Sequence, residues 1–186
     1  MEGMVKKYQQ KFRKVRDETK RWDELQSRLL SQFRNASSII ERLQAIQNSK
    51  KLRYFEMHRW DRRCSVKKAD GVFGNHFALI EKDSIVRDGR QLVKGGSVKL
   101  TMKQLQQRIG VKPSLADCLD GLSLLHEMHQ SEYLLKSSVV SALSTLTLKP
   151  SASDLGALHQ LLVDQPNIPK EEVQFIFDIV FAEEIC

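Results

Sequence analysis

Apolar and polar positions alternate with a helical period along the first quarter of the chain. Apolar residues recur every seven positions, at Val15, Trp22, Leu29, Ala36 and Leu43. Other apolar residues fill the half-turns between them: Tyr8, Phe12, Leu25, Phe33, Ile39, Ile40 and Ile46. The pattern is typical of an amphipathic helix, and no glycine or proline interrupts it after Gly3. We therefore predict one helix from Met4 to about Gln47, whose apolar side must pack on a partner helix in this chain or in another.

A second helical region begins at Pro113. Ser114 is followed three residues later by Asp117, a variant of the capping box that marks helix starts. Residues at helical spacing then follow, namely Leu115, Leu119, Leu122, His126, His129, Tyr133, Lys136, Val140 and Leu143. We predict a helix from this cap to about Leu146.

Two shorter helices should close the chain. Ser151 and Asp154 repeat the preceding cap, and a leucine-rich helix should follow and end before Gln165. Pro169 is expected at the first position of the last helix. The last helix has a strong apolar stripe made of Val173, Ile176, Phe177, Val180 and Phe181, extended by Phe175 and Ile179. This stripe either fills a core or binds a protein partner.

The region between the first helix and Pro113 lacks a lasting period. Residues 49–84 combine many basic residues with five aromatic ones, and we predict an irregular basic linker there. With suitable codons, residues 67–84 read one base later spell a helical pattern, so an altered splice or gene model is a hypothesis for this segment. Residues 85–110 should form short helices around a Gly95–Gly96 hinge. The second of these should run from a cap at Thr101 through Ile109 and end at Gly110.

Charge is distributed unevenly along the chain, whose formal net charge is +7. Eight basic residues and three acids lie between residues 1 and 21, whereas residues 151–186 contain seven acids and Lys170 as the only lysine or arginine. Some basic residues lie off the apolar stripe and are expected to contact phosphate groups or an acidic partner: Lys6, Lys7, Lys14 and Arg21. Aromatic residues do not alternate with them as base stacking would require.

The cysteines and the chain's opening residues suggest a reducing compartment. The three cysteines, Cys64, Cys118 and Cys186, are odd in number and widely separated, which disfavours a disulfide framework. The opening residues lack the apolar core of a signal peptide, and no apolar run is long enough to span a membrane. We therefore expect the nucleus and/or the cytoplasm, and neither secretion nor a membrane location.

The sequence gives no sign of a catalytic or metal site. His126, Glu127 and His129 are one residue short of the His-Glu-x-x-His zinc motif, and half-buried helix histidines fit them better. The chain has no Gly-x-Ser-x-Gly elbow, phosphate-binding loop or Cys-x-x-Cys pair. We expect no enzyme activity, cofactor, metal or small-molecule substrate.

Several short phrases of the chain resemble known families. They are Met-Glu-Gly-Met-Val-Lys-Lys-Tyr-Gln-Gln-Lys-Phe at residues 1–12, Pro-Ser-Leu-Ala-Asp-Cys-Leu at 113–119, Glu-Tyr-Leu-Leu-Lys at 132–136, and the acidic helix at 171–184. The chain resembles a plant family of small helical proteins over residues 1–48 and 85–186, and departs from it between residues 50 and 84. Its C-terminal part is more distantly similar to the animal AIRIM family, whose members partner AAA-type ATPases in ribosome maturation.

We therefore predict an all-α protein. Its parts are a long N-terminal amphipathic helix (residues 1–48) in a helical hairpin or coiled coil, the linker, the short helices and a small C-terminal helical bundle (residues 111–186). The resemblance implies a non-catalytic adaptor or assembly factor in ribosome maturation that contacts an AAA-type ATPase complex. Partner contacts are expected at Val173, Ile176, Phe177, Val180, Phe181 and Tyr133. An electrostatic RNA-binding protein, touching RNA or the pre-ribosome, and a self-associating coiled coil remain alternatives.

The linker also carries a consequence for the first helix. If its pairing helix is the segment altered between residues 50 and 84, part of the apolar stripe should be partly exposed, at Val15, Trp22, Leu29 and Leu43.

Overall fold

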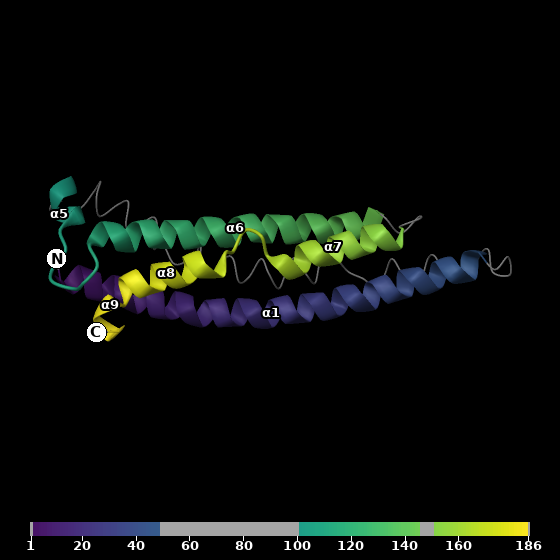
Figure 1. Ribbon diagram of the computed structural model, residues 1–186, viewed down its shortest axis with the longest axis horizontal. Helices are drawn as coiled ribbons and strands as arrows, with labels where there is room; N and C mark the ends of the chain where they lie inside the picture. The colour runs from purple at the N-terminus through teal and green to yellow at the C-terminus, as the bar shows by residue number, and fades with distance from the viewer. Residues whose placement is uncertain (1, 49–100, 146–150, 186) are drawn as a thin grey trace. The chain divides into compact units, whose positions relative to one another are not determined.

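The computed structural model describes residues 2–48, 101–145 and 151–185 (Figure 1). These residues form helices α1 (Glu2–Asn48), α5 (Met102–Gln106), α6 (Leu115–Thr145), α7 (Ala152–Asp164), α8 (Lys170–Val180) and α9 (Ala182–Ile185). Within those ranges no strand occurs, and the only bridge is an isolated antiparallel pair between Ile109 and Lys112. The all-α prediction, with a long first helix and a C-terminal helical cluster, is confirmed.

Helix α1 is uninterrupted over 47 residues and exceeds the predicted range by one or two residues at each end. Nothing inside it breaks the backbone ladder, because Gly3 lies in the first turn and proline is absent.

The two predicted serine caps are present. At the start of α6, Asp117 N–H donates to Ser114 Oγ over 3.0 Å, and Ser114 N–H donates to Asp117 Oδ2 over 2.9 Å. At the start of α7, Ser151 and Asp154 make the same reciprocal pair at 3.1 Å each. Each pair satisfies backbone donors that the first turn of a helix leaves without partners.

Two helix boundaries differ from the prediction. Helix α5 has its expected cap at Thr101 but ends at Gln106, because Gln107 turns to extended backbone and Lys112 N–H donates to Ile109 O in a tight turn. Gly110 adopts φ +62° in that turn, so it serves the turn rather than closing a helix. Pro169 is the N-cap of α8 instead of its first residue.

Other predictions lie outside the described residues. These are the basic linker over residues 49–84, the altered reading frame within it, the helix expected from residue 85, the hinge at Gly95–Gly96, and the end of α6 at Leu146.

The described residues divide into two compact units. The first unit contains residues 2–21, 101–131 and 167–185, and the second contains residues 22–48, 132–145 and 151–166. Helices α1 and α6 therefore each contribute a segment to both units.

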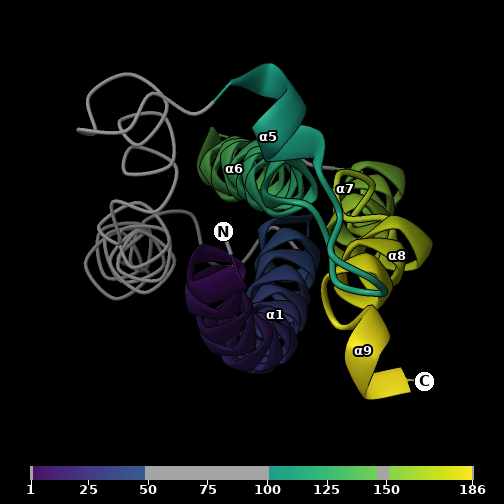
Figure 2. The ribbon, with the colours of Figure 1, turned by 90° about the vertical axis from the view of Figure 1, so that its left-hand side faces the viewer.

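The first unit has an apolar core between α1, α6 and α8, which surround it in an end-on view (Figure 2). The ring of Phe12 meets that of Phe177 edge to face, with centroids 6.1 Å apart. Gly121 allows α6 to approach closely, since a Cβ there would lie 2.9 Å from Ile176 Cγ2 and 3.3 Å from Phe12 Cζ. The buried residues of this core are Tyr8, Phe12, Val15, Leu105, Leu115, Cys118, Leu122, Leu125, Met128, Ile176, Phe177, Val180 and Phe181.

The second unit is built from the later parts of α1 and α6 and from α7. Trp22 is 1% exposed, and its Nε1–H donates to Gln165 Oε1 over 2.8 Å. The rings of Phe33 and His159 lie 5.9 Å apart. Other buried apolar residues of the unit are Leu25, Leu29, Ile40, Val139, Leu143, Leu155 and Leu162.

The expected exposure of the α1 stripe is wrong for most of its positions. Val15 is buried in the core of the first unit, Trp22 and Leu29 are buried in the second, and Leu43 is half-buried. Helices from the second half of the chain therefore cover the stripe, and burial ends only near the end of α1, where Ile39 and Ile46 are exposed.

Candidate interaction surfaces

Two side chains of types that can perform chemistry, Cys118 and His129, are buried in the first unit. Cys118 is buried, and burial raises the pKa of its thiol to about 12, with the neighbouring Asp117 carboxylate adding to the shift. Its reactive thiolate is therefore scarce at neutral pH. The Nδ1 atom of the buried His129 lies 2.8 Å from Leu125 O, one turn earlier. Within the described ranges, no three His, Cys, Asp or Glu side chains are grouped so that they could hold a metal ion.

Most of the predicted partner-binding residues lie inside the first unit. Ile176, Phe177, Val180 and Phe181 belong to its core, and Val173 packs against that core half-buried. Tyr133, in the second unit, is half-buried. The stripe thus fills a core in this structure, and its role in partner binding stays a prediction.

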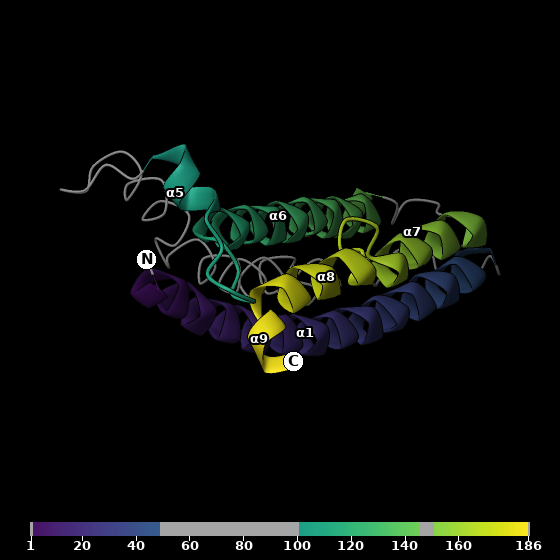
Figure 3. The same ribbon diagram turned by 60° about the vertical axis from the view of Figure 1, so that its left-hand side comes forward.

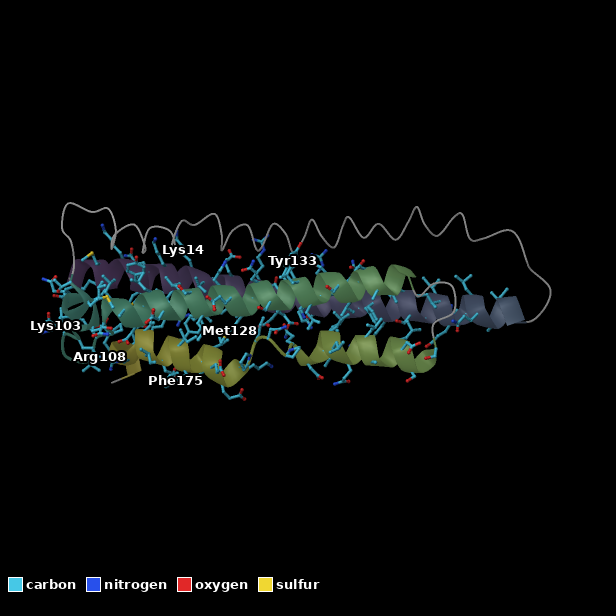
Figure 4. The ribbon with its side chains drawn as sticks, turned by 90° about the horizontal axis from the view of Figure 1, so that it is seen from above. Lys14, Lys103, Arg108, Met128, Tyr133 and Phe175 are labelled. Carbon is cyan, nitrogen blue, oxygen red and sulfur yellow. The ribbon has the colours of Figure 1, made fainter. Side chains whose placement is uncertain are left out.

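The opposite side of α8 is exposed and carries an aromatic residue. Phe175 is 65% exposed and projects from the outer edge of the helix (Figure 4). Glu171, Glu172 and Asp178 are exposed on neighbouring turns, and Gln174 Nε2–H donates to Asp178 Oδ1 over 2.7 Å. We call Glu171, Glu172, Phe175 and Asp178 the acidic face of α8.

The position of Phe175 in the helical period is a sequence signal for the acidic face of α8. The prediction that Phe175 extends the apolar stripe is wrong, because its side chain is 65% exposed. At 100° per residue it lies roughly opposite the centre of the stripe, which runs through Val173, Ile176 and Val180. A large apolar residue in that position is either exposed or covered by a partner.

The residues of α1 predicted to contact phosphate groups or an acidic partner are all exposed. Lys6 forms an ion pair with Glu2 at 3.7 Å. Lys7, Lys14 and Arg21 form no hydrogen bond or ion pair with any part of the chain that the structure describes, and they follow one another at seven-residue intervals. Figure 4 shows Lys14 on the outer side of the first unit. We call Lys7, Lys14 and Arg21 the basic row.

Helix α9 lies beside α1 (Figure 3), and its acids bind residues of α1 that are not in the basic row. Gln9 Nε2–H donates to Val180 O over 3.0 Å and to Glu183 Oε1 over 2.7 Å. Glu184 Oε1 lies 2.5 Å from Arg13 Nη2, and the Arg13 guanidinium also lies over the Phe181 ring at 5.8 Å.

Lys112 adds a further ion pair at this end of the unit. It bonds to Glu2 and lies 3.9 Å from Glu183 Oε2. The hydrogen bond with Lys112 holds the pKa of Glu2 below its usual range, and the same bond raises the pKa of Lys112.

Comparison with known proteins places the chain in a family. A family described as CA109-like, "Ribosome biogenesis protein C1orf109-like", matches residues 2–58 and 79–185. The chain belongs to this C1orf109-like family. The predicted similarity to AIRIM is confirmed, because AIRIM is the C1orf109 protein. Residues 59–78, which the family does not match, fall within the segment where the sequence pattern breaks down.

Membership in the C1orf109-like family gives the chain a role in ribosome biogenesis. No curated protein matches this family member. None of its described helices has the length and apolar character needed to cross a membrane.

Proposed function

We propose that the protein is a non-catalytic adaptor in ribosome maturation, which brings an AAA-type ATPase complex to pre-ribosomal particles in the nucleus or the cytoplasm. The observation that carries the proposal is the pair of exposed faces on the first unit of a ribosome biogenesis protein. One face is acidic with an aromatic centre, and the other is a row of cations.

The acidic face of α8 has the composition of a protein-binding surface. Interfaces draw most of their binding energy from a few aromatic or cationic anchors that enter pockets, surrounded by polar groups that exclude water. Phe175 supplies such an anchor, and Glu171, Glu172 and Asp178 supply an acidic rim. The surface fits an apolar pocket bordered by lysine or arginine, and we assign that pocket to the ATPase complex.

The burial of potentially reactive side chains supports the non-catalytic part of the proposal. Cys118 is kept as a thiol by burial, and His129 is held beside a backbone carbonyl. Lys136 and Glu132 face each other inside the second unit. These groups are directed into the packing and not toward a substrate.

Self-association through α1 loses its main support. A coiled coil between copies would need the stripe of α1 to be free, whereas its apolar residues from Val5 to Ile40 are largely buried within the two units. The other alternative, RNA binding, is compatible with an adaptor function and concerns the basic row of α1.

The test uses full-length protein and the purified AAA-type ATPase complex. Phe175→Ala should weaken binding at least about thirtyfold, as expected when an anchor worth roughly 2 kcal/mol is removed. Met102→Ala is the matched control, because Met102 is 68% exposed and lies on α5, a different helix of the same unit. Titration by surface plasmon resonance measures both, and circular dichroism verifies that each variant is folded.

Unchanged binding by Phe175→Ala, or an equal loss in Met102→Ala, would show that the acidic face does not bind the complex. A deletion of α8 is unsuitable for this test. It would remove Ile176, Phe177 and Val180 from the core of the first unit and unfold it.

A further inference from the structure

The basic row differs from the other cations of its segment because nothing within the described chain engages it. Eight lysine and arginine residues lie between residues 2 and 21. Five of them are engaged: Lys6 by Glu2, Arg13 by Glu184, Lys20 by Asp17, Lys11 over the Tyr8 ring, and Arg16 over the Phe181 ring. The three that remain are Lys7, Lys14 and Arg21, and they form the row.

The row is regular and exposed. Its members lie seven residues, or two helical turns, apart, which places them about 10 Å apart along the axis of α1. All three side chains are exposed. In the second unit, Arg28 follows Arg21 by seven residues and Arg42 follows Arg28 by fourteen, with Asn35 between them, and both arginines are exposed.

Such a row attracts an anionic ligand, and its surroundings decide which one. Between residues 2 and 21 no large apolar side chain is exposed, and the intervening positions Gln10 and Asp17 are polar. An acidic protein would find no apolar anchor here, unlike a partner at the acidic face of α8. A phosphate backbone needs cations alone.

The same surroundings exclude base recognition by stacking. Tyr8 and Phe12, the aromatic residues of this segment, are buried, so no ring is presented beside the cations. The ligand is therefore bound by its charge, independently of sequence.

We propose that the basic row binds the sugar–phosphate backbone of RNA. Ribosomal RNA is the abundant polyanion for a member of a ribosome biogenesis family. The inference deepens the proposed adaptor function by naming what the basic row binds, and its test depends on neither the ATPase complex nor the acidic face of α8.

The experiment compares two triple variants of the full chain with equal charge. The row variant is Lys7→Gln/Lys14→Gln/Arg21→Gln. The control is Lys6→Gln/Lys20→Gln/Lys103→Gln, which removes two engaged cations of α1 and one exposed cation of α5. Each variant loses three charges, so its formal net charge falls from +7 to +4.

Fluorescence anisotropy with a single-stranded RNA and an RNA duplex, at several salt concentrations, gives the readout. Three lost phosphate contacts should reduce the slope of log affinity against log salt by about two for the single strand and by nearly three for the duplex. Between 50 and 200 mM salt, the wild-type chain should therefore lose about 20- to 40-fold more affinity than the row variant. The control variant should keep nearly the full slope.

Several results would overturn the inference. They are the absence of RNA binding, equal slope losses in the two variants, and tighter binding of a polyglutamate peptide than of RNA, which would assign the row to an acidic protein. Phe175→Ala should leave RNA binding intact, and the row variant should retain the ATPase complex. Failure of one surface is thereby distinguished from failure of the other.

Discussion

The two units differ in the chemistry of their interiors, although both contain segments of α1 and α6. The first unit packs aromatic and aliphatic residues from α1, α6 and α8 around Phe12. The second unit encloses an ion pair, in which Lys136 Nζ lies 2.7 Å from Glu132 Oε1 with the side chains 2% and 0% exposed. Lys136 also lies 5.8 Å from the centroid of the Trp22 ring and 3.5 Å from Leu162 O.

The apolar interior of the first unit and the charged interior of the second depend differently on the exact positions of their atoms. Apolar contacts depend on area and shape, whereas an ion pair contributes only when its atoms meet. Lys136 and Glu132 lie four residues apart in α6, and Lys136 reaches α1 and α7 through its contacts with Trp22 and Leu162. Burial lowers the pKa of Lys136, and the Glu132 carboxylate opposes that shift, so the pair is maintained against a desolvation cost. Around it, Gln26 Nε2–H donates to Leu162 O, which gives α7 a fixed register on α1.

The largest expected effect breaks the polar interior of the second unit. Lys136→Met replaces the side chain with an unbranched apolar one that is a single atom shorter, and it leaves the Glu132 carboxylate buried without its ammonium partner. We expect the free energy of unfolding to fall by about 3–5 kcal/mol. The double variant Lys136→Met/Glu132→Leu should recover most of that loss, since it removes both charges. Urea denaturation measures both variants, and a double variant no more stable than the single one would contradict a cost arising from the orphaned charge.

A smaller effect comes from two helical glycines, one in each unit. Gly121→Ala would place a Cβ 2.9 Å from Ile176 Cγ2 in the first unit, whereas Gly156→Ala has no atom within 4 Å in α7. We expect Gly121→Ala to destabilise the protein by about 1–3 kcal/mol through overpacking. Gly156→Ala should stabilise it by up to about 1 kcal/mol through helix propensity. The two midpoints in urea should therefore move in opposite directions, and a shared direction would refute close packing at Gly121.

The smallest expected effect compares the two serine caps across pH. Burial would raise the pKa of Asp117, but hydrogen bonds from the N–H and hydroxyl of Ser114, with Arg108 nearby, lower it below its ordinary value of 3.8. Hydrogen bonds from Ser151 lower the pKa of Asp154, which is exposed.

Because each folded carboxyl has the lower pKa, the unfolded chain binds more protons near pH 3–4 and stability there rises with pH. The stabilisation is complete above the ordinary pKa and is lost as the pH falls through the lowered one. Asp117→Asn should lower the free energy of unfolding by about 0.5–1 kcal/mol at neutral pH. It should also make the loss of stability in acid less steep. Asp154→Asn should change the acid profile less. Thermal unfolding between pH 2 and pH 7 measures the stability profile of each variant. Equal changes in the two profiles would contradict a larger contribution from the Asp117 cap than from the Asp154 cap.

Local sequence signals predicted the elements well. The long α1 followed from the absence of breakers, and the starts of α6 and α7 followed from Ser114 and Ser151, because these features act over a few residues. The end of α5 was missed, since Gly110 can close a helix or form a turn, and the hydrogen bond between Ile109 and Lys112 decided between them.

The sequence pattern does not predict which residues from distant parts of the chain contact one another. The exposed cations of α1 could be recognised, but which of them stay free depends on α9, because Glu184 engages Arg13. Likewise, the partial exposure predicted for Trp22 is wrong, and the acceptor for its buried indole N–H is Gln165, which follows α7. The apolar stripe of α8 is visible in the sequence, and the helical period places Phe175 opposite it, but only the packed core shows which side of α8 is exposed.

The hydrogen bond from Gln9 to Val180 also has a kinetic consequence. It closes a loop of 171 residues, and the core of the first unit joins the same two ends of the chain. Contacts of such high sequence separation make folding slow, because chain entropy is lost before packing compensates for it. During synthesis α1 emerges long before α8, so its apolar side remains without its native cover until almost the whole chain has been translated.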